Sequence, residues 1–194
     1  MRRLLLLSLF TLVCISCQTG TMHDLSSTYA TQAVDELQKG NSGLAVELFA
    51  KALELEPQSI AHRYNLGLAL YTNEQYGQAL TVLNESLALY PHQSRFFLLK
   101  AKVLSEVGEQ VEALQVYRKL FDIDPGSYEL QALVMQQALK WGYTEEAQAL
   151  ALRLLDIHQQ EEKALEVLAQ IHGPESWYAK ILLFLKPETS ATSP

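Results

Sequence analysis

The sequence predicts an all-α fold of helical hairpins arranged in tandem, followed by a short apolar helix pair. Three observations lead to this fold class: a repeat with a period of 34 residues, small residues at two fixed positions of the period, and a proline near its end. Self-similarity at such a period is the signature of solenoid arrays, in which each unit buries its apolar face against its neighbours. With 194 residues, of which 48% are hydrophobic, the chain is large enough to build such a core.

The repeat aligns four segments without a gap, over residues 26–59, 60–93, 94–127 and 128–161. Position 8 of the segments holds Ala33, Gly67, Ala101 and Met135. Position 20 is always alanine, namely Ala45, Ala79, Ala113 and Ala147. Position 24 holds Phe49, Leu83, Tyr117 and Ala151. Small residues at positions 8 and 20 allow two antiparallel helices to approach to the short end of the usual range of about 8–10 Å, so each segment is predicted to be one helical hairpin.

Glycine, proline and serine mark the ends of the expected helices. Position 15 holds Gly40, Glu74, Gly108 and Gly142, and glycine there accepts the left-handed backbone that ends a helix. Position 32 holds Pro57, Pro91 and Pro125, which cannot continue the second helix of a hairpin. Ser59, Ser94 and Ser127 follow these prolines and are predicted to cap the next helices.

Together with the Leu66-Gly67 pair, this pattern resembles the tetratricopeptide repeat. The resemblance covers residues 26–159 and implies a right-handed superhelical solenoid of four hairpins, whose first helices line a concave groove. Two further apolar segments, 161–171 and 175–186, are separated by Gly173-Pro174. They are predicted to form a degenerate fifth hairpin, within residues 160–186, that caps the array. Residues 187–194 are polar and are predicted to be a disordered tail.

The first residues of the chain predict a cleaved signal. Arg2 and Arg3 precede twelve apolar or small residues, 4–15, which are too few for a bilayer span of about 20 residues. The end of this stretch, Ile15-Ser16-Cys17, resembles the lipobox of bacterial lipoproteins, although Cys14 stands where leucine is usual. The resemblance implies a signal peptide over residues 1–16, lipidation of Cys17 and a linker over residues 17–25. The alternative is an ordinary secretory signal cleaved after Ser16 or Gly20.

The lipobox resemblance also implies a location. In such lipoproteins the cysteine carries a diacylglycerol and a third acyl chain, such as palmitate, and three chains anchor a protein durably. Aspartate after the cysteine retains a lipoprotein at the inner membrane. Gln18 follows here, which implies the outer membrane of the bacterial cell envelope, with the folded part in the periplasm.

Composition and motif content argue against several classes of function. A net charge of −7 without a basic stripe argues against nucleic acid as a partner. Both cysteines precede residue 18, so the folded part contains no disulfide. The histidines are scattered and are interpreted as surface or loop residues: His23, His62, His92, His158 and His172. Because no nucleophile–base pair, metal-ligand cluster or phosphate loop is recognisable, the sequence predicts a protein that is not an enzyme, with no catalytic residue, no metal site and no cofactor.

Positions 5, 9 and 12 form one stripe along the first helix of each repeat. In the second and third repeats this stripe, with one neighbouring arginine, gives the predicted partner-binding groove: Tyr64, Leu68, Tyr71, Arg95, Leu98 and Lys102. Aromatic and arginine side chains supply much of the binding energy at interfaces, so the groove suits a peptide with apolar anchors and at least one acidic residue. In the alternative interpretation, Leu37, Leu68 and Leu98 pack between repeats.

One tetratricopeptide subclass grips a C-terminal carboxylate with lysines, asparagines and an arginine at fixed positions. Those positions hold Ala30, Val34, Asn65, Arg95 and Leu99, of which only Asn65 and Arg95 fit. A carboxylate clamp is therefore not expected. The sequence predicts instead a membrane-anchored scaffold, adaptor or assembly factor that binds another envelope protein or peptide segment. The alternative function is a transport accessory protein that binds a small hydrophobic ligand or a periplasmic binding protein.

Overall fold

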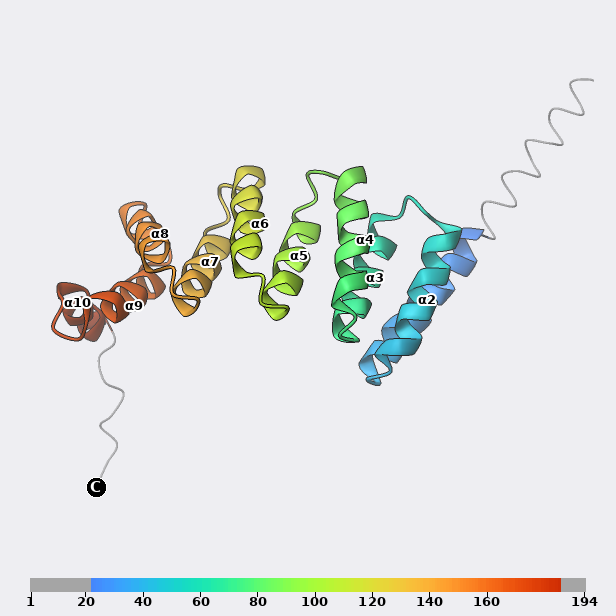
Figure 1. Ribbon diagram of the computed structural model, residues 1–194, viewed down its shortest axis with the longest axis horizontal. Helices are drawn as coiled ribbons and strands as arrows, with labels where there is room; N and C mark the ends of the chain where they lie inside the picture. The colour runs from blue at the N-terminus through green and yellow to red at the C-terminus, as the bar shows by residue number, and fades with distance from the viewer. Residues whose placement is uncertain (1–21, 186–194) are drawn as a thin grey trace, which may run out of the picture. The chain divides into compact units, whose positions relative to one another are not determined.

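The computed structural model describes residues 22–185, and every regular element in that range is an α-helix, as predicted (Figure 1). The helices are, in chain order, a helix over residues 22–38, α2 (Ser42–Leu55), α3 (Ile60–Thr72), α4 (Tyr76–Leu89), α5 (Ser94–Glu106), α6 (Gln110–Ile123), α7 (Tyr128–Lys140), α8 (Thr144–Asp156), α9 (Glu161–His172) and α10 (Trp177–Leu185). None of the helices within residues 22–185 combines the length and apolarity that a membrane crossing requires. The predicted signal peptide, Cys17 and the tail over residues 187–194 lie outside the described residues, and residues 22–25 of the expected linker are helical.

The predicted turns are confirmed in their backbone geometry. Gly40, Gly108 and Gly142 have φ values of +82°, +86° and +84°, in the left-handed region that favours glycine. Glu74 adopts the same region, with φ of 58°, although its side chain makes this conformation costly. Helices α2, α4 and α6 each end two residues before a proline, as expected.

The predicted serine caps are only partly right. The Ser59 hydroxyl accepts a hydrogen bond from the His62 backbone N–H at 3.3 Å, which caps α3. Helix α5 already includes Ser94, because the cap position of the repeat lies one residue earlier, at Gln93. Ser127 stands at the cap position of α7, but its side chain makes no capping hydrogen bond. The expectations for Ser94 and Ser127 are therefore wrong.

The chain divides into two compact units, residues 1–108 and 109–194, at the turn inside the third repeat. In the first unit α2 packs against α3, and α3 packs against both α4 and α5. In the second unit α6 packs against α7, α7 against α8 and α9, and α9 against α10. Within each unit, neighbouring helices along the chain are thus neighbours in space, as in a helical solenoid.

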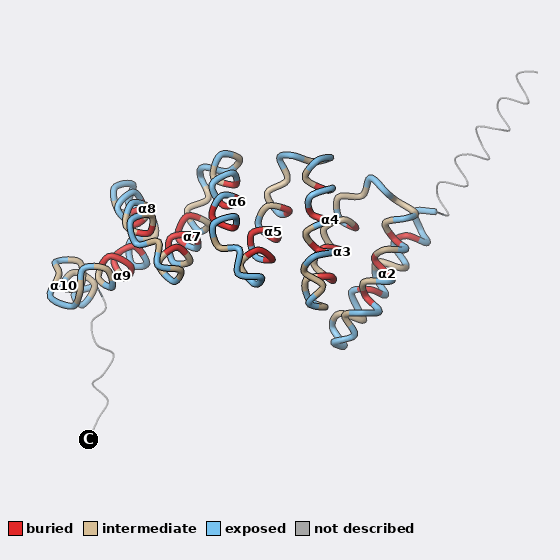
Figure 2. The backbone as a smooth tube through the Cα atoms, viewed as in Figure 1, coloured by how far each residue is buried: buried red, intermediate tan, exposed pale blue. Residues whose placement is uncertain are grey.

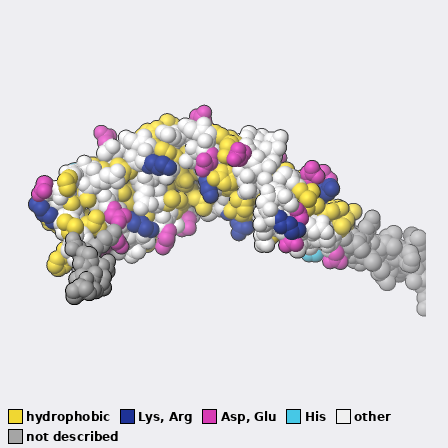
Figure 3. Space-filling view, turned by 90° about the horizontal axis from the view of Figure 1, so that it is seen from below, with side chains coloured by type: hydrophobic (Ala, Val, Ile, Leu, Met, Phe, Trp, Pro, Cys, Tyr) yellow, Lys and Arg dark blue, Asp and Glu magenta, His cyan; other side chains and the backbone are white. Residues whose placement is uncertain are grey.

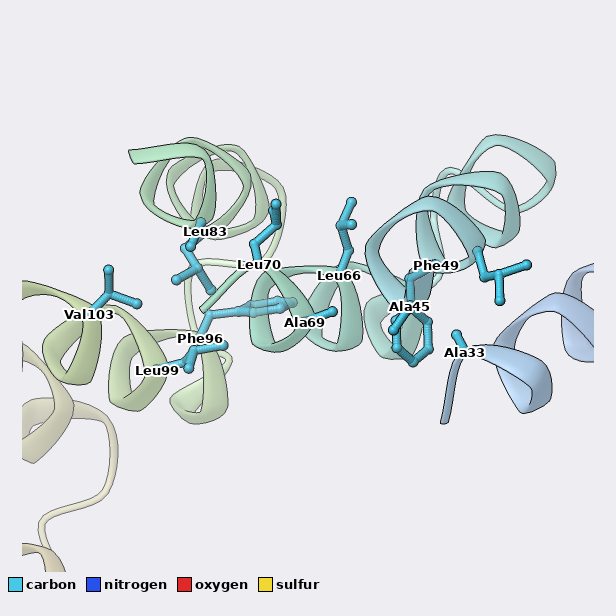
Figure 4. Close-up of a cluster of buried hydrophobic side chains, with 12 residues drawn as sticks. Ala33, Ala45, Phe49, Leu66, Ala69, Leu70, Leu83, Phe96, Leu99 and Val103 are labelled. Carbon is cyan, nitrogen blue, oxygen red and sulfur yellow. The ribbon is translucent and has the colours of Figure 1, made fainter. Parts of the chain in front are cut away.

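The core of the repeats lies where the sequence predicts it. All residues at positions 20 and 24 of the four repeats are at most 4% exposed, and those at position 8 are buried. Figure 2 shows buried residues recurring along the helices, whereas α10 contains none. In the first unit, side chains from α2, α3, α4 and α5 meet in one cluster, which includes Phe49, Leu70, Leu83 and Phe96 (Figure 4).

Gly67 shows why position 8 of the second repeat must be small, although the fourth repeat accommodates the buried Met135 there. A Cβ atom at this residue would lie 3.3 Å from Leu83 Cδ2 and 3.5 Å from Leu99 Cδ2. The backbone of α3 therefore approaches side chains of α4 and α5 closely at Gly67, and a larger residue at this position would separate these helices. This close packing fixes how the first helices of repeats two and three lie beside one another.

Candidate partner-binding face

The predicted site residues belong to two helices that contact each other, α3 and α5. Their spacing of three or four residues places them on one side of each helix. We call the six residues Tyr64, Leu68, Tyr71, Arg95, Leu98 and Lys102 the aromatic–basic face. All six lie within the first compact unit, so their mutual geometry is defined.

Two cation–π contacts join α5 to α3 across this face. The Arg95 Cζ atom lies 5.5 Å from the ring centre of Tyr64, and the Lys102 Nζ atom lies 5.1 Å from the ring centre of Tyr71. Each such contact at an exposed site contributes about 0.5–1 kcal/mol. Because both contacts bridge the two helices, the residues that the sequence assigned to two separate stripes lie on the same side of the first unit.

The two tyrosine rings also pack inside the unit. Tyr64 lies 6.4 Å from Phe96 and Tyr71 lies 5.9 Å from Tyr76, measured between ring centres. The Tyr71 hydroxyl donates a hydrogen bond to Glu106 Oε1 at 3.3 Å. Burial and the charge of Glu106 raise the pKa of Tyr71 above its usual value, so the phenol stays neutral around pH 7. It is therefore a hydrogen-bond donor and an apolar surface, not an anion.

The six residues differ in how far they are exposed. Tyr64, Leu68 and Tyr71 are half-buried and pack against the core of the first unit, and so does Leu37. Leu98 is 42% exposed, and Arg95 and Lys102 are exposed. The three α3 residues are thus partly buried against the core and partly open to solvent. The three α5 residues are exposed.

The structure agrees with the expectation that the carboxylate-clamp positions do not bind a carboxylate as a set. Leu99 is 4% exposed and belongs to the core cluster, so it cannot reach a ligand. Ala30 and Val34 have no polar atom in their side chains to donate to a carboxylate. Arg95, which fits the clamp, lies over the Tyr64 ring.

A polar cluster between the first helix and the turn from α2 to α3 was not predicted. Ser26 is 0% exposed and His62 is 8% exposed, so the expectation that His62 is a surface histidine is wrong. The Ser26 hydroxyl donates to the Ala52 carbonyl at 3.1 Å and lies 2.7 Å from His62 Nε2. The sequence does hold a signal for this burial, since His62 is spaced four and eight residues from the core residues Leu66 and Leu70.

This cluster has a serine, a histidine and a glutamate, but not the geometry of a catalytic triad. Glu56 Oε2 lies 3.1 Å from His62 Nε2, the same nitrogen that contacts Ser26, whereas His62 Nδ1 is buried without a hydrogen-bond partner. In a triad the nucleophile and the acid bind opposite nitrogens of the imidazole. Glu56 also binds His23, and this hydrogen bond raises the pKa of His23 and lowers that of Glu56. The cluster therefore ties the first helix to α2 and α3.

The distribution of charge agrees with the acidic composition of the sequence, which has a net charge of −7. On the face drawn in Figure 3, Lys and Arg side chains stand apart from one another, with acidic side chains among them. A phosphate backbone requires a continuous basic surface. The face in Figure 3 does not present one.

Sequence comparison relates part of the chain to repeat proteins. The family model described as anaphase-promoting complex, cyclosome, subunit 3 matches residues 38–120. A TPR repeat-containing protein of Methanocaldococcus jannaschii is 32% identical over 119 residues, which are 61% of this chain and 21% of that protein. The anaphase-promoting complex subunit 3 of Dictyostelium discoideum is 25% identical over 80 residues, which are 41% of this chain and 8% of that protein. The chain thus spans about a fifth or less of the length of these curated relatives.

Solved structures share the fold at low sequence identity. A tetratricopeptide repeat protein from Parabacteroides merdae has a TM-score of 0.69 at 18% identity, covering 86% of this chain and 68% of that one. A MamA protein has a TM-score of 0.69 at 13% identity, covering 88% and 99%. The first TPR of Spaghetti (RPAP3), bound to an HSP90 peptide, has a TM-score of 0.54 at 13% identity, covering 61% and 97%. These matches show that the chain has a helical solenoid fold like that of tetratricopeptide repeat proteins, and repeats of that kind generally mediate protein–protein interactions.

Proposed function

We propose that this protein is a lipid-anchored scaffold or assembly factor of the bacterial cell envelope, and that it binds a partner protein through the aromatic–basic face. The observation that carries the binding part is the pair of cation–π contacts by which Arg95 and Lys102 of α5 lie over tyrosines of α3. They support a surface that combines two cations, two partly exposed tyrosines and the exposed Leu98.

The chemistry of this face specifies the kind of partner. Leu98 and the tyrosine edges offer apolar contact, whereas Arg95 and Lys102 attract a carboxylate. The chain as a whole carries a net charge of −7, so the attraction of an acidic side chain is local. A peptide segment with an aliphatic anchor and at least one nearby aspartate or glutamate satisfies both requirements. Truncation of an anchor at such a surface typically costs 2 kcal/mol or more of binding energy.

The binding proposal is tested by charge reversal at a matched pair of lysines. Lys102 Nζ lies 5.1 Å from the Tyr71 ring centre, and Lys51 Nζ lies 5.9 Å from that of Tyr29, so each lysine covers one tyrosine. Both are exposed, and only Lys102 belongs to the aromatic–basic face. The full chain with Lys102→Glu is expected to lose the partner captured from envelope extracts, whereas Lys51→Glu keeps it.

Both variants are expected to retain the helical circular dichroism and to melt within a few degrees of the wild type, because exposed substitutions cost little. If Lys102→Glu captures the partner as well as the wild type does, the face assignment is wrong. Equal loss in both variants points to nonspecific charge attraction and also contradicts the assignment.

The anchoring part of the proposal rests on the sequence motif Ile15-Ser16-Cys17. Three acyl chains at Cys17 would hold the protein at the membrane without any basic contact to lipid headgroups. Cys17→Ser is expected to abolish the incorporation of labelled palmitate and to leave an unprocessed precursor. Labelling that persists in Cys17→Ser contradicts the lipid anchor, while leaving the binding test of Lys102 unaffected. Gln18 supports an outer-membrane location, which fractionation of the envelope tests.

A further inference from the structure

The last helix of the second unit presents an apolar surface to solvent. Helix α10 has no buried residue, and Trp177, Leu183 and Phe184 are 66%, 72% and 86% exposed. Its other side packs on α9, where Tyr178 lies 5.3 Å from the ring centre of His172. At 100° per residue, Trp177, Leu183 and Phe184 point away from the side that carries Tyr178 and Leu182. The exposed side chains therefore form one outer face.

The first helix of the first unit has an outer face of the opposite kind. Its exposed residues on that side are mostly polar or acidic, with the exposed Leu25 and Val34 at its two borders: Asp24, Ser27, Thr28, Thr31, Gln32, Asp35 and Gln38. A terminal repeat needs such a polar outer surface to remain soluble. Helix 22–38 satisfies this requirement and α10 does not, although the sequence predicted that α10 belongs to the capping hairpin.

We infer that the outer face of α10 is an interaction surface for a second copy of this chain. Taking about 200–250 Å² for a large side chain, the exposed fractions of Trp177, Leu183 and Phe184 leave roughly 450–500 Å² on each copy. Two copies thus bury at most about 900–1,000 Å², which is below the range of stable specific interfaces and within the range of weak ones. The area predicts a weak dimer that depends on concentration.

The charges near α10 are compatible with a symmetric pairing. Lys180 is the basic residue of this helix, and its Nζ atom lies 3.9 Å from Glu175 Oε2, so the ammonium is directed toward the start of the helix. Its aliphatic stem can cover apolar surface while the charge stays in water. Lys180 lies between Leu183 and Phe184 on this face, and in a two-fold arrangement each copy contributes one Lys180 with one Glu175 beside it, so each cation keeps an opposite charge nearby.

Other occupants are less suited to this face. Head-to-tail stacking would place α10 against the polar side of helix 22–38 and would desolvate Asp24 and Asp35. Residues 186–194 contain no large apolar side chain that could cover Phe184. A lipid surface is the remaining alternative occupant, and the vesicle measurement below distinguishes it from a second copy. In a symmetric dimer, the outer face of α10 on one copy packs against the same face on the other copy, so no second kind of surface is needed.

The test compares two double variants of the full chain, each of which introduces two glutamates. Sedimentation in a non-ionic detergent measures how strongly each protein dimerises. The double variant Leu183→Glu/Phe184→Glu changes α10, and the control Thr31→Glu/Gln32→Glu adds the same charge to the outer side of helix 22–38. The wild type and the control are expected to dimerise as the concentration rises. The α10 variant is expected to dimerise roughly thirtyfold more weakly or not at all, with unchanged helical content.

A second measurement reports directly on the proposed contact. Trp141 and Trp177 are the two tryptophans of the chain, so Trp141→Phe leaves Trp177 as the fluorescent probe. Its emission is expected to shift to shorter wavelength over the concentrations at which the dimer forms. A wild type that stays a single copy, or a dimer that the α10 variant leaves intact, overturns the inference. Binding of the monomer to neutral or anionic vesicles, lost in the α10 variant, would also overturn it and assign the face to lipid.

Discussion

Replacing Leu83 with alanine tests the packing that positions the aromatic–basic face. Leu83 is 0% exposed and lies in the core cluster shared by α3, α4 and α5. The substitution removes three carbon atoms, worth about 2.4 kcal/mol at about 0.8 kcal/mol per methylene. The cavity left beside Gly67 adds to this cost, so we expect a loss of about 3–4 kcal/mol in the free energy of unfolding. For a protein of this size that loss lowers the melting temperature by roughly 6–15 °C.

The structure also predicts how Leu83 and Gly67 are coupled. In the wild type, a Cβ at residue 67 would lie 3.3 Å from Leu83 Cδ2, so the helix-propensity gain of Gly67→Ala, up to about 1 kcal/mol, is offset by crowding. In the Leu83→Ala background the nearest remaining contact is Leu99 Cδ2, at 3.5 Å. Gly67→Ala should therefore be more favourable there, by about 0.5–1 kcal/mol.

The assay is urea unfolding of the four proteins of this cycle, followed by circular dichroism. Leu89→Ala is the matched control, because Leu89 lies on the same helix and is 49% exposed; it should cost about 1 kcal/mol or less. A cost below about 1 kcal/mol for Leu83→Ala, or the same effect of Gly67→Ala in both backgrounds, would refute the packing described for α3, α4 and α5.

Three further predictions concern stability. Ala113 is 0% exposed, so Ala113→Leu should overpack α6, cost about 1–3 kcal/mol or more and lower the melting temperature; an unchanged midpoint would show that the repeat register is wrong. Glu74 holds a left-handed φ of 58°, so Glu74→Gly should stabilise the protein by about 0.5–1 kcal/mol, whereas Gly108→Ala, at φ of +86°, should destabilise it. Because Glu56 raises the pKa of His23, the stabilisation from this pair is present below the unfolded pKa of about 6.5 and lost as pH rises through the raised folded pKa. On the acid side this stabilisation is lost as pH falls through the lowered pKa of Glu56. The difference in stability between the wild type and His23→Gln should therefore be largest between the lowered pKa of Glu56 and the unfolded pKa of His23. A difference that is independent of pH would contradict the pairing.

The sequence was sufficient to predict the hairpins because its signals are local. Glycine at position 15, proline at position 32 and small residues at positions 8 and 20 each constrain one turn or one helix crossing, and the structure confirms the turns and the buried crossings, with Glu74 at position 15 and Met135 at position 8 as exceptions to the pattern. The C-terminal helices expected over residues 161–171 and 175–186 are found as α9 and α10, within two residues at each end.

What the sequence could not predict depends on distances between elements. The spacing of positions 5, 9 and 12 predicts that these residues lie on one side of the helix. It does not predict how closely the next repeat packs against that side. Tyr64 and Tyr71 are therefore both packed and accessible at an edge, a combination that neither alternative interpretation contained. The contact of Ser26 with His62 spans 36 residues and joins two helices, so no local pattern indicates it.

Site-specific photo-crosslinking in living cells tests the central claim, that a partner binds the aromatic–basic face. Leu98 on α5 and Leu89 on α4 are comparably exposed, at 42% and 49%, and both belong to the first unit. A photoreactive amino acid at residue 98 should yield a discrete adduct with another protein, and Lys102→Glu in the same chain should remove it. The same probe at residue 89 should yield none. A discrete adduct at residue 89 with none at residue 98 would contradict the account.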